Sequence, residues 1–484
     1  MEKTEIKTRK ISEVKFRIEK EDYQTMNTNV DIFAKEDMLL KMKQDRTLQQ
    51  AVNTAALPGI VGNVLVMPDG HEGYGFPVGG VVAFDAEEGI ISPGICGFDI
   101  NCGIRIIKTN LDGKDIRGKI SELSDALFRN VPSGVGSRKN LGFDDKDLEK
   151  VATYGVEHVI DKGFGFSTDS EKIEENGMMD GADFRDVSKF AKARGLHELG
   201  TLGAGNHFLE IQEVSNIYDD KAADVYGVSK GQAVIMIHTG SRGFGHQICS
   251  DYLRVLEVYG REHGIKLPDP ELSYAPVDSK EAKAYLRAMK CAVNYAFTNR
   301  QMITYAVRKS FEDVFGKSAD SLGMDILYDL AHNIVKLEEH RIEGRKRSVF
   351  VHRKGATRAF PKGSSDVPKE YRDIGQPVLI PGSMSTASYV LAGEQNALEE
   401  TFGSACHGSG RVMSRHQAIR EIPASRTFET LKKKGVEIRI RSRKLVSEEA
   451  EWAYKNVDEV VEVVDSAGIA SMVSRNVPVV VVKG

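Results

Sequence analysis

The hydrophobic positions of this chain fall into two patterns that alternate along its length. Short continuous apolar runs, typical of buried strands, end in loops rich in glycine and polar residues. Apolar residues spaced three or four apart among charged ones, typical of helices with one buried face, fill much of the remainder. The expected strands are residues 63–67, 78–84, 232–237, 348–351, 377–380, 436–440 and 477–482. The expected helices are residues 35–53, 186–198, 281–315, 324–340 and 448–466.

These elements show no repeat of fixed period, and no polar linker divides them. We therefore predict one large α+β domain over residues 1–484, in which mixed sheets are surrounded by helices. Residues 113–162 are helical and charged in pattern, but a glycine loop at 132–136 interrupts them. Such a loop can cradle a phosphate, although it is far more often only a turn. The glycine-rich, acidic residues 163–183 are expected to form a surface excursion.

The composition is that of a soluble globular protein. Of 484 residues, 41% are hydrophobic and 28% are charged, and the 46 glycines, about a third above average, imply many tight loops. The five cysteines are scattered, which favours free thiols or ligands in a reducing cytoplasm over a disulfide framework. Neither an apolar leader nor a membrane-spanning run is recognisable, so we expect a cytoplasmic protein without a membrane partner.

The charge pattern leaves the question of nucleic-acid binding open. A formal net charge of −4 argues weakly against such binding. Basic clusters at 341–347, 352–362 and 432–444 argue the other way. Clusters of this kind are usually solvated faces, and they would favour RNA binding only if they surround one cleft.

The polar loops that follow the strand-like runs carry the candidate metal chemistry. Asp99 and Cys102 lie three residues apart in the glycine-bounded segment 97–103. Such a pair presents a hard oxygen and a soft sulfur to one point, and a thiolate can bridge two divalent ions. A buried cysteine beside a turn aspartate is the simpler interpretation, and only the histidines farther along change it. They are His207, His238, His352 and His407 in other loops and His332, expected off the buried stripe of helix 324–340.

Together these side chains offer the nitrogen, sulfur and oxygen ligands that divalent metals bind. Ligand softness alone favours zinc, and a two-metal site suited to phosphoryl transfer also fits. His407 differs from the others, because small residues around it would let a ligand approach and Arg411 could pair with a phosphate. Its imidazole could attack phosphorus, or it could have no covalent role.

Six segments, in order along nearly the whole chain, resemble the RtcB family of RNA-splicing ligases. They are MPDGHEGYGFPVGG at 67–80, GFDINCG at 97–103, GAGNHFLE at 203–210, HTGSRGFGH at 238–246, HRKGATR at 352–358 and CHGSGR at 406–411. The resemblance implies an RtcB-like fold and a GTP-dependent ligase active in tRNA splicing and RNA repair. Such a ligase joins RNA ends bearing a 2′,3′-cyclic phosphate or 3′-phosphate to a 5′-hydroxyl.

The resemblance also implies roles for individual residues. Asp99, Cys102 and His207 would hold one manganese ion, and Cys102 would bridge to a second held by His238 and His332. The resemblance therefore implies manganese, whereas ligand softness alone favours zinc. His407 would become guanylylated. The implied GTP pocket is Asn206, His207, Phe208, Leu209, Glu210, His332, Asn333, Pro381, Gly382, Ser383, Met384, Ser388, His407, Gly408, Ser409, Gly410, Lys483 and Tyr454, with Tyr454 against the guanine.

The implied partners are RNAs, namely tRNA exon halves and other cleaved RNA ends. Their phosphates would be held by the basic segment containing Arg353, Lys354 and Arg358. Archease is a candidate activating protein, and we expect a monomer. Cys96 and the pair Glu451-Trp452 depart from the family pattern.

Two other functions are weighed against the ligase. A dinuclear metallophosphoesterase would need the same metals but neither His407 nor Lys483. An RNA-binding factor would need the basic loops but not Cys102.

Overall fold

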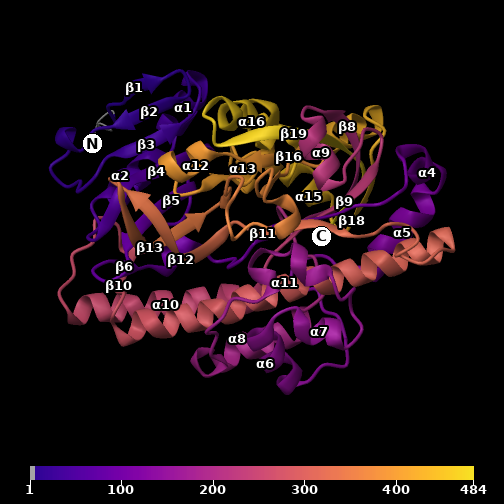
Figure 1. The fold of residues 1–484 in the computed structure, drawn as a ribbon, viewed down its shortest axis with the longest axis horizontal. Coiled ribbons are helices and arrows are strands. Elements are labelled where there is room, and N and C mark those ends of the chain that lie inside the picture. The colour runs from indigo at the N-terminus through magenta and orange to yellow at the C-terminus, as the bar shows by residue number, and fades with distance from the viewer. Residues whose placement is uncertain (1–5) are drawn as a thin grey trace.

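Two large sheets form the frame of the molecule, and the computed structural model describes residues 6–484 (Figure 1). The first sheet has seven strands in the order β1-β2-β3-β4-β5-β13-β12. Their bounds are β1 Arg9–Ser12, β2 Lys15–Ile18, β3 Val30–Phe33, β4 Ile60–His71, β5 Val78–Asp85, β13 Arg345–Lys354 and β12 Asn333–Ile342.

The second sheet has eight strands, in the order β11-β7-β9-β8-β19-β16-β15 with β18 beside β19. Their bounds are β11 Ile326–Ala331, β7 Gly103–Ile107, β9 Ala233–Thr239, β8 Phe208–Ile217, β19 Ala470–Lys483, β16 Ser388–Gly393, β15 Pro377–Ile380 and β18 Glu437–Ile440. Two further two-stranded sheets pair β14 (Ala356–Arg358) with β17 (Ser404–Cys406) and β10 (Ala275–Pro276) with β6 (Ile90–Ile91).

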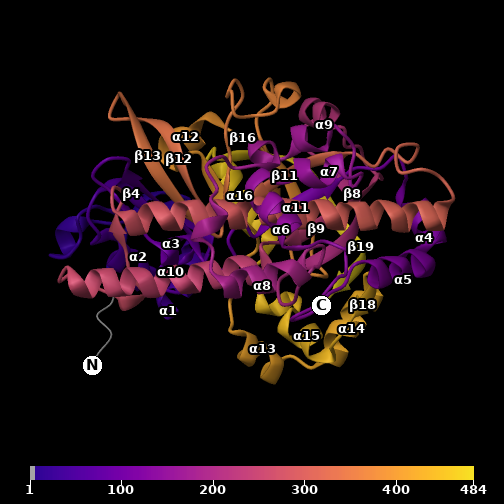
Figure 2. The same ribbon diagram turned by 90° about the horizontal axis from the view of Figure 1, so that it is seen from below.

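Two long helices, α10 (Arg242–Glu262) and α11 (Lys280–Phe315), run side by side under the sheets (Figures 1 and 2). Helix α11 begins where the Ser279 hydroxyl accepts a hydrogen bond from the Ala282 N–H, and it ends at the left-handed Gly316. Its middle is buried on all sides, because α6 (Asp145–Tyr154), α7 (Glu157–Asp161) and α8 (Lys189–Glu198) cover the face turned away from the sheets.

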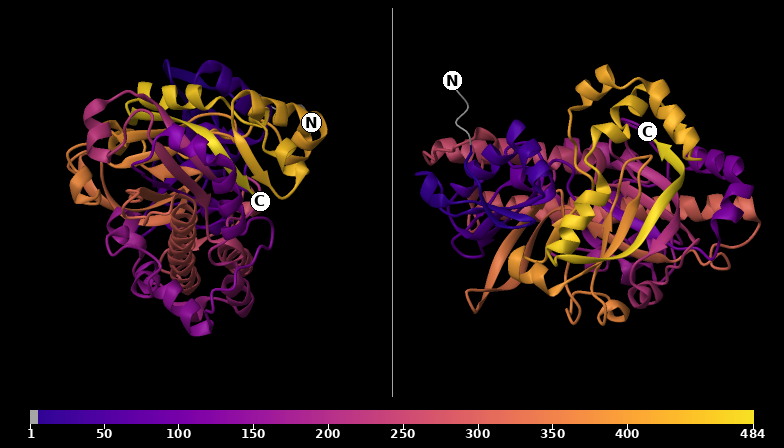
Figure 3. Two further views of the ribbon diagram at one scale, coloured as in Figure 1. Left: turned by 90° about the vertical axis from the view of Figure 1, so that its right-hand side faces the viewer. Right: turned by 90° about the horizontal axis from the view of Figure 1, so that it is seen from above.

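The remaining helices lie around the sheets. Helices α13 to α15 project from the body beside the C-terminus, as the views from below and from above show (Figure 2 and the right panel of Figure 3). The bounds are α1 Glu36–Gln44, α2 Thr47–Ala55, α3 Pro93–Cys96, α4 Gly113–Gly118, α5 Ile120–Asn130, α9 Asp220–Tyr226, α12 Gln395–Glu400, α13 Arg415–Glu421, α14 Ala424–Lys433, α15 Arg443–Glu448 and α16 Val457–Ser466.

The predicted α+β class, with mixed sheets and surrounding helices, is confirmed. The predicted helix over 324–340 is wrong, because β11 and β12 occupy this segment. All six residues of β11 are buried, and an apolar run of this kind fits a helical stripe as well as a buried strand. His332 lies in the turn between these two strands. It therefore reaches the site from the end of a strand and not, as predicted, from the face of a helix.

Other helix boundaries also differ from the prediction. The expected helix over 448–466 begins only at Val457, after a short 3₁₀ turn, and the expected helix over 35–53 is divided into α1 and α2. The predicted surface excursion at 163–183 is wrong for Asp169 and Glu174, whose carboxylates are buried against Arg308 and Lys336.

Candidate active site

The five predicted metal ligands converge because the strands that carry them are neighbours. Cys102 directly precedes β7 and His332 directly follows β11, while His207 precedes β8 and His238 lies near the end of β9. In the antiparallel registers Gly103 lies opposite both Ala331 and Thr239, and Phe208 lies opposite His238. Four segments distant in sequence therefore meet at one end of the eight-stranded sheet.

The donor atoms form two groups that share the Cys102 sulfur. One group is Asp99, Cys102 and His207, the other is Cys102, His238 and His332, and in each the donor atoms lie within 4.8 Å of one another. The Cys102 Sγ is 3.4 Å from His207 Nε2 and 3.3 Å from His238 Nε2. The His207 Nε2 is 2.9 Å from an Asp99 carboxylate oxygen. A shared thiolate between two such groups suits a pair of divalent ions.

The electrostatics of the ligands fit a cation. Burial lowers the pKa of His238 and His332, so both imidazoles stay neutral and keep a lone pair. Burial, and next the charge of Asp99, raise the pKa of the Cys102 thiol, so its thiolate needs a neighbouring positive charge. Within residues 6–484, the Nδ1 atoms of His238 and His332 are buried without a hydrogen-bond partner. Neutral imidazoles grouped around a buried thiol form a donor set that a divalent cation would satisfy.

His407 follows β17 and lies beside the second ligand group. Its Nδ1 is 2.5 Å from an Asp69 carboxylate oxygen, which also accepts the His407 backbone N–H at 3.1 Å. Since Nδ1 is engaged by the carboxylate, Nε2 is the ring nitrogen with an available lone pair. The His407 and His332 ring centroids are 4.9 Å apart. The candidate nucleophile therefore adjoins the candidate metal centre.

Both features open into one cavity of about 670 Å³. Besides His407 and the five metal ligands, its walls include many of the residues implied for GTP binding. These are Asn206, Phe208, Asn333, Pro381, Gly382, Ser383, Met384, Gly408, Ser409, Gly410, Tyr454 and Lys483.

The other three implied GTP residues lie behind this wall. Leu209 packs in the core on the opposite face of β8. The Gln212 side-chain amide donates to both Glu210 and Ser388, and the Ser388 hydroxyl accepts the Gly382 N–H. Burial raises the pKa of Glu210 to about 7. Glu210 and Ser388 therefore stabilise the cavity wall through their hydrogen bonds and do not line the cavity themselves.

Tyr454 belongs to a buried polar cluster that the sequence did not reveal. Its hydroxyl donates to Glu449, and Arg411 donates to both residues. The Lys483 ammonium lies 3.2 Å from the Glu449 carboxylate. Burial alone would raise the pKa of Glu449, but Lys483 and Arg411 hold it at about 2. Glu449 therefore connects the residue expected against the guanine with the lysine at the end of β19.

Asp69 is the second important residue to which the sequence assigned no role. It lies within the 67–80 motif, and that motif was the one signal that pointed to it. Only the fold brings β4 next to β17, and with it the carboxylate next to His407.

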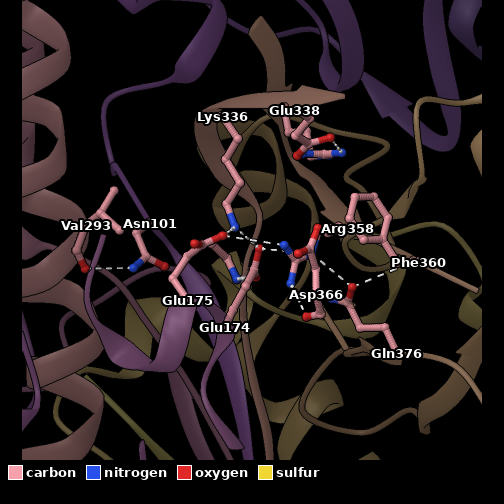
Figure 4. Close-up of polar contacts among 12 residues, drawn as sticks. Asn101, Glu174, Glu175, Val293, Lys336, Glu338, Arg358, Phe360, Asp366 and Gln376 are labelled. Atoms are coloured by element: carbon pink, nitrogen blue, oxygen red, sulfur yellow. Dashed lines mark hydrogen bonds and ion pairs between the residues drawn. The ribbon is translucent and has the colours of Figure 1, made fainter. Parts of the chain in front are cut away.

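The expectation that Arg353 and Arg358 hold RNA phosphates is wrong. Arg353 is fully buried and pairs with Glu338. Arg358 is also buried, and its guanidinium contacts Glu174, Glu175 and Gln376 (Figure 4). Both side chains are buried by the packing of the sheets. The basic residues around them in the sequence gave no sign of this burial.

Two further residues of the same motif also have structural contacts. Lys354 lines the cavity, but its ammonium donates to backbone carbonyls, including those of Phe76 and Gly94. His352, a candidate ligand from its position after a strand, lies inside β13 with its ring against Phe84. It is therefore excluded from the metal ligand set.

The departures from the family pattern lie outside the ligand groups. Cys96 is buried in α3, and burial raises the pKa of its thiol to about 12. Glu451 accepts hydrogen bonds from Ser385 and Lys434, and the Arg426 guanidinium lies 3.9 Å from the Trp452 ring centroid. Along the described 6–484 range, no helix combines the length and the apolar character needed to cross a membrane.

Comparison with known proteins shows the family of this chain. The family model described as tRNA-splicing ligase RtcB matches residues 50–484. The tRNA-splicing ligase RtcB of Thermococcus kodakarensis is 53% identical over 476 residues, 98% of each chain. The proteins of the same name from Pyrobaculum aerophilum and Archaeoglobus fulgidus are 52% and 48% identical, over 94% and 98% of each chain. This chain therefore belongs to the RtcB family of tRNA-splicing ligases.

Proposed function

We propose that this protein joins RNA ends bearing a 2′,3′-cyclic phosphate or 3′-phosphate to 5′-hydroxyl ends, with GTP, two Mn²⁺ ions and a covalent GMP–His407 intermediate. The observation that carries the proposal is the Asp69–His407 pair beside two ligand groups that share Cys102, all within one cavity. The substrates would be tRNA exon halves and other cleaved RNA ends, joined in the cytoplasm by a monomer, with archease as a candidate activator.

Two ligand groups would hold the ions, Asp99, Cys102 and His207 in one and Cys102, His238 and His332 in the other. When bound, divalent ions would neutralise charge that develops on phosphate oxygens. The choice of manganese over zinc rests on the family resemblance, since a thiolate and three imidazoles also suit zinc.

His407 would act as the nucleophile in the first step. With Nδ1–H held by Asp69, the Nε2 lone pair attacks the α-phosphorus of GTP. A P–N bond forms, the P–O bond to the β-phosphate breaks, and pyrophosphate leaves. The Asp69 carboxylate stabilises the positive charge that develops on the ring.

The later steps would transfer the nucleotide and seal the RNA. Water opens the cyclic phosphate to a 3′-phosphate, whose oxygen attacks the GMP phosphorus and releases His407. The 5′-hydroxyl oxygen then attacks the activated 3′-phosphorus and loses its proton to solvent. A 3′,5′-phosphodiester forms as the bond to GMP breaks.

The glycines after His407 support close approach of the nucleotide. Gly410 has φ +67°, and a Cβ atom there would lie 2.1 Å from the Asp69 carbonyl oxygen. A larger residue would displace the strand that holds the His407 partner. The small side chains therefore serve both the cavity wall and the Asp69–His407 geometry.

The test is incubation of the protein with Mn²⁺ and α-labelled GTP. We expect a label on the protein that survives denaturation and is lost in acid, as from a histidine phosphoramidate. His407→Ala should abolish the label, and His263→Ala, at an exposed histidine beyond α10, should retain it. A wild type that stays unlabelled but hydrolyses phosphodiesters would favour the metallophosphoesterase. RNA binding without either reaction would favour the RNA-binding factor.

A further inference from the structure

Arg300, on α11, has a fully buried guanidinium beneath the metal ligands. Its Nη1 donates to the Asn101 carbonyl at 2.9 Å and the Thr239 carbonyl at 2.8 Å. Its Nη2 donates to the Asn101 side-chain oxygen at 3.0 Å and to Asp329 at 2.7 Å, and Nε donates to both Asp329 oxygens. All five N–H donors of one side chain are therefore in use.

Every one of these acceptors lies close in sequence to a metal ligand of the second group. Asn101 directly precedes Cys102, and Thr239 directly follows His238. Asp329 lies on β11, three residues before His332. One planar cation thus joins the three segments that supply Cys102, His238 and His332, and its hydrogen bonds go to neighbouring residues of these ligands.

Asn101 strengthens the link between α11 and the ligand loop. Its backbone has φ +50°, a left-handed conformation that is uncommon for residues other than glycine. The conformation is held by the Asn101 side-chain amide, which donates to the Val293 carbonyl of α11 at 2.8 Å (Figure 4). Val293 and Arg300 are seven residues apart, so about two helical turns present both groups on one face.

We propose that Arg300 is a positioning residue that sets the spacing of Cys102, His238 and His332 for metal binding, with α11 as the rigid base. Lysine could not replace it, because an ammonium offers three donors from one point and cannot span the same acceptors. The inference rests on the metal centre of the proposed function and deepens it.

The test compares Arg300→Lys with Arg308→Lys. Arg308 is a matched control, since it is also a buried arginine of α11 and pairs with Asp169 and the Met324 carbonyl, away from the ligand segments. Calorimetric titration with Mn²⁺ and Co²⁺ measures affinity, and the thiolate-to-Co²⁺ absorption band reports the geometry at Cys102. We expect Arg300→Lys to weaken Co²⁺ binding roughly 10- to 100-fold and to alter the band. Arg308→Lys should keep both properties, even if thermal unfolding shows equal destabilisation.

Wild-type affinity and an unchanged band in Arg300→Lys would overturn the proposal. If that variant does not fold, Asn101→Gly tests the same hydrogen-bonded link between α11 and the ligand segments. Glycine accepts the left-handed backbone but loses both side-chain hydrogen bonds of Asn101. We expect a loss of about three- to tenfold in Co²⁺ affinity, and wild-type affinity would count against the positioning role of Arg300 and Asn101. A wild-type protein that binds neither metal would instead refute the metal centre itself, which separates the two failures.

Discussion

The hydrogen bond between Asp69 and His407 decides which nitrogen of the imidazole can react. Asp69→Asn should lower the rate of GMP transfer to His407 by roughly 100-fold or more, because an amide can donate to Nδ1 and favour the wrong tautomer. Single-turnover labelling with α-labelled GTP measures this rate. Asp85→Asn, which alters a carboxylate paired with Arg347 outside the cavity, should label at the wild-type rate. Equal labelling of the two variants would contradict the role given to Asp69.

Glu210 should make the stability of the ligand-free protein depend on pH. Burial raises its pKa from 4.5 to about 7, so the stability contributed by the protonated carboxyl is complete below pH 4.5 and is lost as the pH rises through 7. Glu210→Gln should therefore gain stability relative to wild type across this window, by up to roughly 3 kcal/mol. Urea unfolding at pH 5 and pH 8 measures the gain. A difference between the two proteins that does not change with pH would refute it.

Single residues were the most predictable level of this site. Asp99, Cys102, His207 and His238 were expected together because each lies in a polar loop or strand end beside an apolar run, and because the family resemblance implies them as metal ligands. Glu449 and Arg300 were not predicted. The burial and the role of a charged side chain depend on contacts with residues distant in sequence, which the sequence does not show. The same reason applies to Asp169 and Glu174.

Among the elements, the segment between α7 and α8 should depend for its stability on the buried carboxylate of Glu174. The Lys336 ammonium lies 2.5 Å from Glu174, whose other oxygen accepts the Ala331 N–H next to His332. Glu174→Gln should cost roughly 3 kcal/mol of unfolding free energy, because it removes the fully buried carboxylate that Lys336 and Arg358 contact and leaves Lys336 with the part-exposed Glu175 alone. Glu175→Gln should cost less than about 1 kcal/mol, since that carboxylate is one-third exposed. Chemical denaturation of both variants measures the costs, and equal values would contradict this ranking.

Most elements were predicted from the sequence, including the fully buried strands β9 and β15, but β11 was assigned to a helix. Helix 281–315 was predicted almost to the residue, because its apolar residues keep the spacing of one buried helical stripe. Residues 326–331 were predicted as helix, because a strand buried on both faces loses the alternation that identifies it. The pairing of β11 with β7 determines the conformation of this segment, and no local sequence pattern indicates that pairing.

At the scale of the whole molecule, metal binding should stabilise the fold, because the ligands come from segments that are separate in the unfolded chain. At a free metal concentration 100 times the dissociation constant, the gain is about 2.7 kcal/mol. Thermal unfolding in Mn²⁺ should therefore occur at a higher temperature than in chelator. Cys102→Ser, which removes the ligand shared by both groups, should lose most of this shift. An equal shift in the variant would mean that the ions stabilise the protein from another site.

Strand β19 pairs with β8 along one side and with β16 and β18 along the other, and it brings Lys483 to the cavity. A premature stop codon before Ala470 would therefore do more than remove a nucleotide contact. It would leave β8 and β16 with open backbone edges, which other chains can join during biosynthesis. Such a product should accumulate as aggregate or be degraded by proteases, so a frameshift late in the gene would resemble a complete deletion rather than a weakened allele.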